Sequence, residues 1–384
     1  MIRAEQLEQC LQIFDSAAAT GAGRVVFLSG DPGSGKSDTL RALSSSLLGR
    51  SESVVLAGGF RGGEYHEFPS DASRNGSPDI LATLFGAIST LEPTTAPIIA
   101  ILRQIIQASG TAAQLLSDMK GRKDRFSGSL DAFRSLVRAA AREQTVACVL
   151  DDLDHSNSDW LVSVLVTFAG ELEKDLKVVF YLGLEDPVDR LLPEEEAGGL
   201  GTVARHLVAG GIGTLLHLKP LTRDEIATWI GDPGLDVART LLKTTNGNPR
   251  WIELLWHHWL QSGTASRPSN HAPWELLRPE DDLATVDDVL GEKLLRALGT
   301  PSNVQETLHI LALASLEGRE FTANAIAELT GQDSDALIDF LDDKLVEIDS
   351  RTAILIESAH VETTTTTLWR YKFKSELDWL TIRR

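Results

Sequence analysis

The sequence has little cysteine, little positive charge and no long hydrophobic run, and each shortage excludes a class of protein. Its 384 residues include two cysteines, Cys10 and Cys148, and both lie in patterns typical of buried thiols in a reducing compartment. No apolar run approaches the roughly 20 residues that cross a bilayer. Arg3, Glu5 and Glu8 interrupt the start, which therefore does not resemble a signal peptide. These patterns predict a cytoplasmic protein with no membrane partner.

The shortage of positive charge argues against one large class of partner. Lys and Arg together number 36, against 55 Asp and Glu, and the net charge is −19. A surface this acidic repels a phosphate backbone, so bulk charge gives no support to non-specific nucleic-acid binding. A local basic patch is compatible with this balance. Binding of a single nucleotide needs only a few well-placed groups and is unaffected by it.

Apolar strand patterns alternate with helical patterns over the first 220 residues. The strands are expected at 24–29, 53–57, 146–150, 177–182 and 214–218, with a loop over 58–80 and mostly helix over 80–143. Alternation of this kind is typical of an α/β fold, in which helices cover both faces of a parallel sheet.

The strands stop after Pro220, and a different organisation follows. Helical patterns at 222–230, 235–244 and 249–260 predict a small helical unit, and 261–274 has the composition of a linker. Helices over 283–348 precede strand-like segments at 352–357 and 366–373. Several helices followed by a β-hairpin predict a winged helix-turn-helix.

The strongest motif is GDPGSGKS, which has the form G-x-x-x-x-G-K-[ST] and lies between a predicted strand and a predicted helix. Glycines let successive backbone N–H groups face one anion, and the helix adds its positive end. Lys36 is expected to reach the β- and γ-phosphates, and the Ser37 hydroxyl to reach Mg²⁺. The predicted nucleotide-binding residues are Gly30, Asp31, Pro32, Gly33, Ser34, Gly35, Lys36, Ser37 and Asp38.

A second motif, VACVLDDLD, predicts the metal side of the same site. An apolar strand ending in Asp151 is expected to run beside the first strand and to deliver a carboxylate to Mg²⁺. Asp152 follows, where many P-loop ATPases carry a glutamate that orients the attacking water. We therefore name Asp151 and Asp152 as candidate catalytic residues. For Asp152, which is one methylene shorter than glutamate, a catalytic and a non-catalytic role are equally favoured.

A third motif, Gly247-Asn248-Pro249, is by itself only a turn followed by a helix with proline at its first position. The order of all the motifs, however, resembles the STAND class of AAA+-related ATPases over nearly the whole chain. The matching segments are RAEQL, GDPGSGKS, LDDLDHSN, LLHLKPLTRDEIATWI, NGNPRWIELL, ETLHILALASLEGREFTANAIAELTG and YKFKSEL.

The resemblance implies four parts and a function. They are a P-loop nucleotide-binding domain over 1–221, a helical lid over 222–262, a linker over 263–281 and a winged-helix domain over 282–384. It implies that Lys36 and Ser37 bind phosphate and Mg²⁺, that Asp151 helps to hold the metal, and that Pro249 contacts the base and sugar. Ile2 and Arg3 would lie by the adenine. Members of the class switch between an ADP-bound idle state and an ATP-bound, often oligomeric state, which implies protein partners or self-association.

Two residues depart from the family pattern. Glu185 follows the fourth strand, where relatives usually offer a residue that senses the γ-phosphate, and Ser375 stands where they often carry a histidine that touches ADP. Both departures argue against fast hydrolysis and a strong ADP latch. Relatives also usually continue into a sensor or effector, so this chain is either a portion of a longer one or works with separate partners.

Two alternatives remain beside a slow ATP-dependent switch. One is a DNA-binding regulator that uses the winged helix, which is less favoured because the stretch LIDFLDDKLVEID is acidic. The other is a nucleotide-binding scaffold without turnover.

Overall fold

The structure is a computed structural model that divides into two compact units. One unit comprises Met1–Asp31 with Gly35–Lys219, and the other comprises Pro32–Ser34 with Pro220–Arg384. The tripeptide Pro32–Ser34 of the glycine-rich loop thus groups with the second half of the chain. The residues described are 3–61, 64–68, 96–119, 128–153, 158–172, 176–184, 200–269, 272–279, 282–298, 301–318, 320–346, 355–362, 367–373, 379 and 382.

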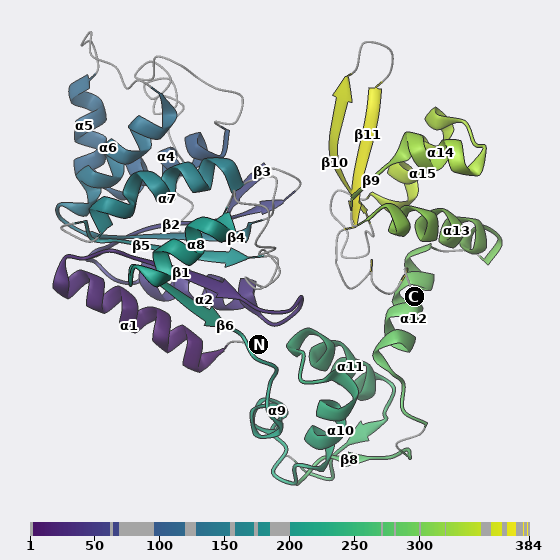
Figure 1. Ribbon diagram of the computed structural model, residues 1–384. Coiled ribbons are helices and arrows are strands. Elements are labelled where there is room, and N and C mark those ends of the chain that lie inside the picture. The colour runs from purple at the N-terminus through teal and green to yellow at the C-terminus, as the bar shows by residue number, and fades with distance from the viewer. Residues whose placement is uncertain are drawn as a thin grey trace. The chain divides into compact units, whose positions relative to one another are not determined.

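The first unit is built on a six-stranded sheet (Figure 1). Its strands are β1 (Arg24–Ser29), β2 (Ser53–Arg61), β3 (Glu64–Glu67), β4 (Thr145–Leu153), β5 (Val178–Leu184) and β6 (Gly213–His217). Their order is β3-β2-β4-β5-β1-β6, and all pairs are parallel except β2 with β3. The predicted parallel α/β fold is confirmed.

Two details of the sheet differ from the sequence-based expectation. β4 does not run beside β1, because β5 lies between them. All three strands are apolar, and a hydrophobic pattern predicts burial without predicting which strands are neighbours. The second difference is β3, which falls in the stretch expected to be a loop; residues 69–80 of that stretch lie outside the described residues.

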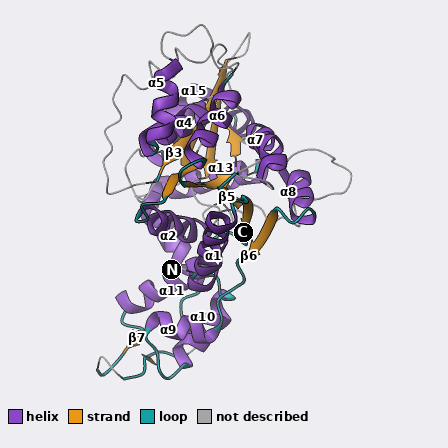
Figure 2. Cartoon of the chain, turned by 90° about the vertical axis from the view of Figure 1, so that its left-hand side faces the viewer, coloured by secondary structure: helices purple, strands orange, loops and turns teal. Residues whose placement is uncertain are grey.

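Helices cover both faces of this sheet (Figure 2). Successive strand residues face opposite sides, so Val25 and Phe27 belong to one core while Val26 and Leu28 belong to the other. The helices α1 (Ala4–Thr20) and α2 (Lys36–Leu48) pack on the second of these cores. The first core is covered by α4 (Ala96–Ala108), α5 (Gly110–Met119), α6 (Ser129–Ala141), α7 (Ser158–Leu172) and α8 (Leu200–Ala209).

The second unit begins with the three helices α9 (Arg223–Ile230), α10 (Asp236–Thr245) and α11 (Pro249–Gln261). Thr222 and Glu225 form a reciprocal capping box at the start of α9, as the sequence Thr-x-x-Glu favours. The stretch expected to be a linker contains a two-stranded ribbon of β7 (Ala265–Ser266) and β8 (Glu275–Leu276). Beside it, the Trp274 indole N–H donates to Ile230 O at 2.9 Å, which holds this segment against the helices.

The rest of the second unit has the element order of a winged helix. It runs α12 (Val286–Leu298), α13 (Pro301–Glu317), β9 (Glu320–Thr322), α14 (Ala323–Thr330), α15 (Ser334–Leu345), β10 (Leu355–Glu362) and β11 (Thr367–Phe373). The strands form an antiparallel sheet in the order β10-β11-β9. Phe321, Tyr371 and Phe373 are buried together in its core. The three-residue strand β9 is too short for a periodic pattern to predict.

Among the described residues, none of the helices combines the length and the apolar composition needed to cross a membrane.

The buried hydroxyl of Tyr181 ties α1 to the sheet, and its removal is testable. The hydroxyl donates to Cys10 O at 2.8 Å, and both side chains are fully buried. Tyr181→Phe leaves that carbonyl without this donor. We therefore expect the free energy of unfolding of the first unit to fall by about 1–2 kcal/mol, as measured by urea denaturation. Tyr371→Phe, whose hydroxyl bonds Asp342 in the second unit, is the control. Equal stability of Tyr181→Phe and wild type would contradict the assignment.

Candidate nucleotide-binding site

The glycine-rich loop connects the end of β1 to the start of α2. β1 is buried up to Ser29, whose side chain is 2% exposed. Gly30, Gly33 and Gly35 have φ of 155°, 76° and 98°, a region that other L-residues rarely adopt. The motif's glycines therefore stand where the backbone must turn in a left-handed sense. Thr39 closes the turn by donating its hydroxyl to Gly35 O at 2.8 Å.

Lys36 places its ammonium over the loop itself. Its Nζ donates to Gly30 O at 2.6 Å and to Asp31 O at 3.3 Å. Lys36 is also the first residue of α2, so its charge adds to the positive end of the helix dipole. A cation and a helix N-terminus at one loop form an arrangement that attracts an anion.

Asp151 lies in a slot between two glycines on the neighbouring strands. Its side chain is 2% exposed, and β4 pairs it with Gly59 of β2. A Cβ on Gly183 of β5 would lie 2.5 Å from Asp151 Oδ1 and 2.7 Å from Leu40 Cδ1 of α2. The missing side chain at position 183 therefore makes room for the carboxylate next to α2, on which Ser37 lies three residues before Leu40.

These residues fit a magnesium ion bound together with a nucleotide. Mg²⁺ prefers oxygen ligands and usually takes one or two carboxylates, with phosphates and water completing its shell. The slot holds one buried carboxylate beside the helix that carries the Ser37 hydroxyl. In the described part of the chain, no group of three or more His, Cys, Asp or Glu could hold a metal by itself. One buried carboxylate and a nearby hydroxyl suit an Mg²⁺ whose remaining ligands are phosphate oxygens and water.

The structure describes some of the other predicted site residues in full, one by its backbone alone, and three not at all. Arg3 is buried at 5% exposure and precedes α1, where its carbonyl accepts from Leu7 N–H. Pro249 is buried at the first position of α11. Asp152 lies on β4, and only its backbone is described. Ile2, Glu185 and Ser375 fall outside the described residues, so their predicted roles stay predictions.

Sequence reasoning missed three residues that shape this site. Gly59 and Gly183 flank Asp151, and each is a glycine inside an apolar strand, a signal for close approach of another group. The third is Asn248, which the sequence pattern by itself places only in a turn. Its amide donates to Pro32 O at 2.7 Å. An Asn before a helix-starting proline predicts an N-cap, but nothing in the sequence links it to a loop more than 200 residues away.

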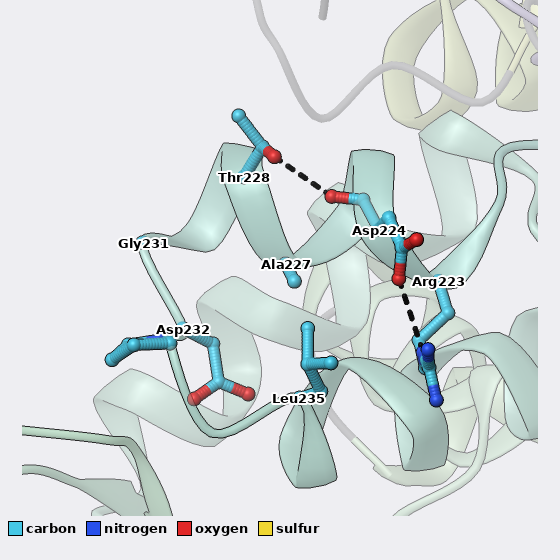
Figure 3. Close-up of a pocket in the computed structure, with 8 residues that line it drawn as sticks. Arg223, Asp224, Ala227, Thr228, Gly231, Asp232 and Leu235 are labelled. Carbon is cyan, nitrogen blue, oxygen red and sulfur yellow. Dashed lines mark hydrogen bonds and ion pairs between the residues drawn. The ribbon is translucent and has the colours of Figure 1, made fainter.

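A pocket of about 650 Å³ lies elsewhere, between α9 and α10 (Figure 3). Arg223 and Asp224 form an ion pair at its edge. Asp232 accepts hydrogen bonds from the backbone N–H groups of Gly234, Ala238 and Trp274. Its carboxylate therefore has a structural role in the turn between the two helices, and the pocket contains none of the predicted nucleotide-binding residues.

Comparison with known proteins agrees with the geometry of the loop. Residues 1–180 match the family of AAA ATPase domains, and this segment contains both the glycine-rich loop and Asp151. This part of the chain is thus an AAA+-related P-loop ATPase domain, a nucleotide-binding fold. No curated protein matches the sequence.

Three solved structures resemble the chain at a distance. The Cdc6 protein of Pyrobaculum aerophilum is 16% identical with a TM-score of 0.37, covering 99% of this chain and 92% of that one. The Orc1 protein of Aeropyrum pernix, solved in complex with DNA, is 13% identical with a TM-score of 0.41, covering 99% and 90%. A STAND protein with a tetratricopeptide repeat sensor from Pyrococcus horikoshii is 11% identical with a TM-score of 0.38, covering 96% of this chain and 41% of that one.

The slot around Asp151 gives a testable prediction with a matched control. Gly183→Ala places a methyl group 2.5 Å from the carboxylate oxygen and must displace it, whereas the Cβ of Gly59→Ala would meet Asp151 Cβ at an ordinary 3.5 Å. We expect Gly183→Ala to weaken ATP binding roughly tenfold in the presence of Mg²⁺ and little in EDTA. Gly59→Ala should bind as wild type does. Calorimetric titration measures both, and an equal loss with and without Mg²⁺ would refute a metal role for Asp151.

Proposed function

We propose that the chain is an ATP- or ADP-binding molecular switch of the STAND type. Slow ATP hydrolysis would be coupled to domain rearrangement or oligomerisation in signalling or defence. The observation that carries the proposal is the loop Gly30–Ser37, in which glycines at positive φ, the Lys36 ammonium and the start of α2 converge. The grouping of Pro32–Ser34 with the second unit supports a switch, because part of the phosphate loop packs with the lid helices.

Each residue of the site has a proposed role. Residues 30–38 bind phosphate through their backbone N–H groups, except Pro32, which has none. Lys36 neutralises the β- and γ-phosphates, and Ser37 with Asp151 holds Mg²⁺. When bound, Mg²⁺ would neutralise charge on the phosphates. Pro249 contacts the base and sugar side, and Ile2 and Arg3 lie by the adenine. Asp152 orients the attacking water. Its shorter side chain is consistent with slow turnover.

Partners other than the nucleotide belong to the proposal as well. A switch requires that the two nucleotide states bias different arrangements of the protein, and a second copy of the chain or a separate protein would receive that change. DNA is less favoured. The helix α15 carries Asp335, Asp339, Asp342 and Asp343 against a single lysine, Lys344, which is an unfavourable charge for contact with phosphates. DNA affinity at low salt that falls steeply as salt rises would revive that alternative.

Lys36→Ala tests the binding proposal. Removing the ammonium deletes the cation that pairs with the phosphates, so we expect ATP affinity to fall by about tenfold or more. The fold should remain, because Nζ donates to the carbonyls of Gly30 and Asp31 in the loop. Titration with a fluorescent ATP analogue measures affinity, and circular dichroism checks the fold. A folded Lys36→Ala variant with wild-type affinity would refute the assignment.

Asp152→Asn separates a slow ATPase from a scaffold. The substitution preserves shape but removes the carboxylate that would orient water, so the single-turnover rate should fall by roughly 10²-fold or more while ATP affinity stays near wild type. Radiolabelled phosphate release under single-turnover conditions measures this. A wild-type protein that binds ATP but releases no phosphate would identify the scaffold instead.

A further inference from the structure

The turn before α11 lies against two segments of the second unit. Asn246 and Gly247 are both left-handed, with φ of 50° and 75°. A Cβ on Gly247 would lie 2.5 Å from Leu221 O, and Leu221 N–H donates to Gly247 O at 2.8 Å. Gly247 is therefore packed directly on the chain that follows Pro220. The next residue, Asn248, contacts the other segment, Pro32–Ser34.

Asn248 makes hydrogen bonds from both ends of its amide. Its Oδ1 accepts from the N–H groups of Arg250 and Trp251 at 3.0 and 3.4 Å, which caps α11. Its Nδ2 donates to Pro32 O at 2.7 Å. The orientation of the amide is unambiguous, because one end faces two donors and the other faces a carbonyl.

A second bond continues the contact along the loop. Arg250 N–H also donates to Gly33 O at 3.2 Å. Position 33 has a φ of 76°, and a Cβ there would lie 2.8 Å from both Arg250 Cβ and Asn248 Oδ1. Two successive loop carbonyls, those of Pro32 and Gly33, are therefore held by the first turn of α11, and only glycine fits between them.

Holding these carbonyls also fixes two N–H groups. In a planar trans peptide the C=O and the N–H point in opposite directions. The peptides that carry Pro32 O and Gly33 O also carry the N–H groups of Gly33 and Ser34, so both N–H groups are turned away from α11. They belong to the set of loop donors expected to bind phosphate.

We propose that Asn248 is a positioning residue of the phosphate loop, which orients the Gly33 and Ser34 N–H groups toward the β-phosphate by holding the carbonyls behind them. The inference rests on the proposed nucleotide binding and adds to it a dependence of phosphate affinity on a side chain that caps a lid helix. Asn248 touches no phosphate itself. It acts through the loop.

Asn248→Asp tests this with little change in shape. Aspartate keeps the oxygen that caps α11 but replaces the amide donor with an oxygen that repels Pro32 O. We expect ADP and ATP affinity to fall roughly tenfold and the thermal midpoint without nucleotide to stay within a few degrees. Asp333→Asn is the matched control. Asp333 caps α15 by accepting from two backbone N–H groups in the same way, so this reverse exchange should leave affinity unchanged.

A phosphorus NMR spectrum of the variant saturated with ADP gives a readout that a merely structural role would not move. The β-phosphate resonance should shift from its wild-type position and the α-phosphate resonance should not. Wild-type affinity in Asn248→Asp would overturn the inference. A variant that loses thermal stability while its β-phosphate resonance stays at the wild-type position would also overturn the inference, because Asn248 would then have only a structural role. If the wild-type protein itself binds no nucleotide, the proposed function fails before this inference is reached.

Discussion

The site depends on one constraint, which is that consecutive peptide N–H groups must face a single anion. A free glycine-rich segment does not hold that shape, because each glycine has many accessible conformations. Here the segment is fixed at both ends. Buried β1 holds its start and α2 begins directly after it. Between them, the Lys36 ammonium draws in the carbonyls of Gly30 and Asp31, while α11 holds those of Pro32 and Gly33. The N–H groups of these peptides, those of Asp31, Gly33 and Ser34, are left to face the opposite side, and Pro32 has none.

The same sheet provides the second part of the site, because the strands on either side of Asp151 carry glycine, which has no side chain, next to it. A carboxylate buried to 2% exposure is costly unless a partner compensates it. The sheet nevertheless makes room for Asp151 by having glycine at Gly59 and Gly183 on the strands beside it. Even a methyl group at position 183 would lie 2.5 Å from Asp151 Oδ1 and 2.7 Å from Leu40 Cδ1. The glycine there leaves the space that the proposed Mg²⁺ role of Asp151 requires.

Much of the fold and the centre of the site could be predicted from sequence, for identifiable reasons. The motif Gly30–Ser37 has a fixed spacing dictated by phosphate geometry, and strand and helix periods placed it between β1 and α2. Local sequence patterns also predict the capped helices α9 and α11 and the final hairpin. Strand order could not be predicted, because the apolar stretches of β4 and β5 are alike and do not predict which strand lies beside β1. The contact between Asn248 and Pro32 could not be predicted either, since it joins residues distant in sequence and depends on which way one amide points.

Asp152 is a predicted candidate base. Its side chain is not described, so that role stays a prediction.

The central claim is that this loop recognises the terminal phosphates of a nucleotide. Calorimetric titration of the purified protein with ATP, ADP and AMP in the presence of Mg²⁺ tests it most directly. Because the proposed contacts of Lys36 and the loop N–H groups are with the β- and γ-phosphates, we expect saturable binding of ATP and ADP near one per chain, and AMP binding weaker by a factor of about ten or more. Absence of saturable binding by all three nucleotides, or AMP affinity equal to that of ATP, would contradict the account.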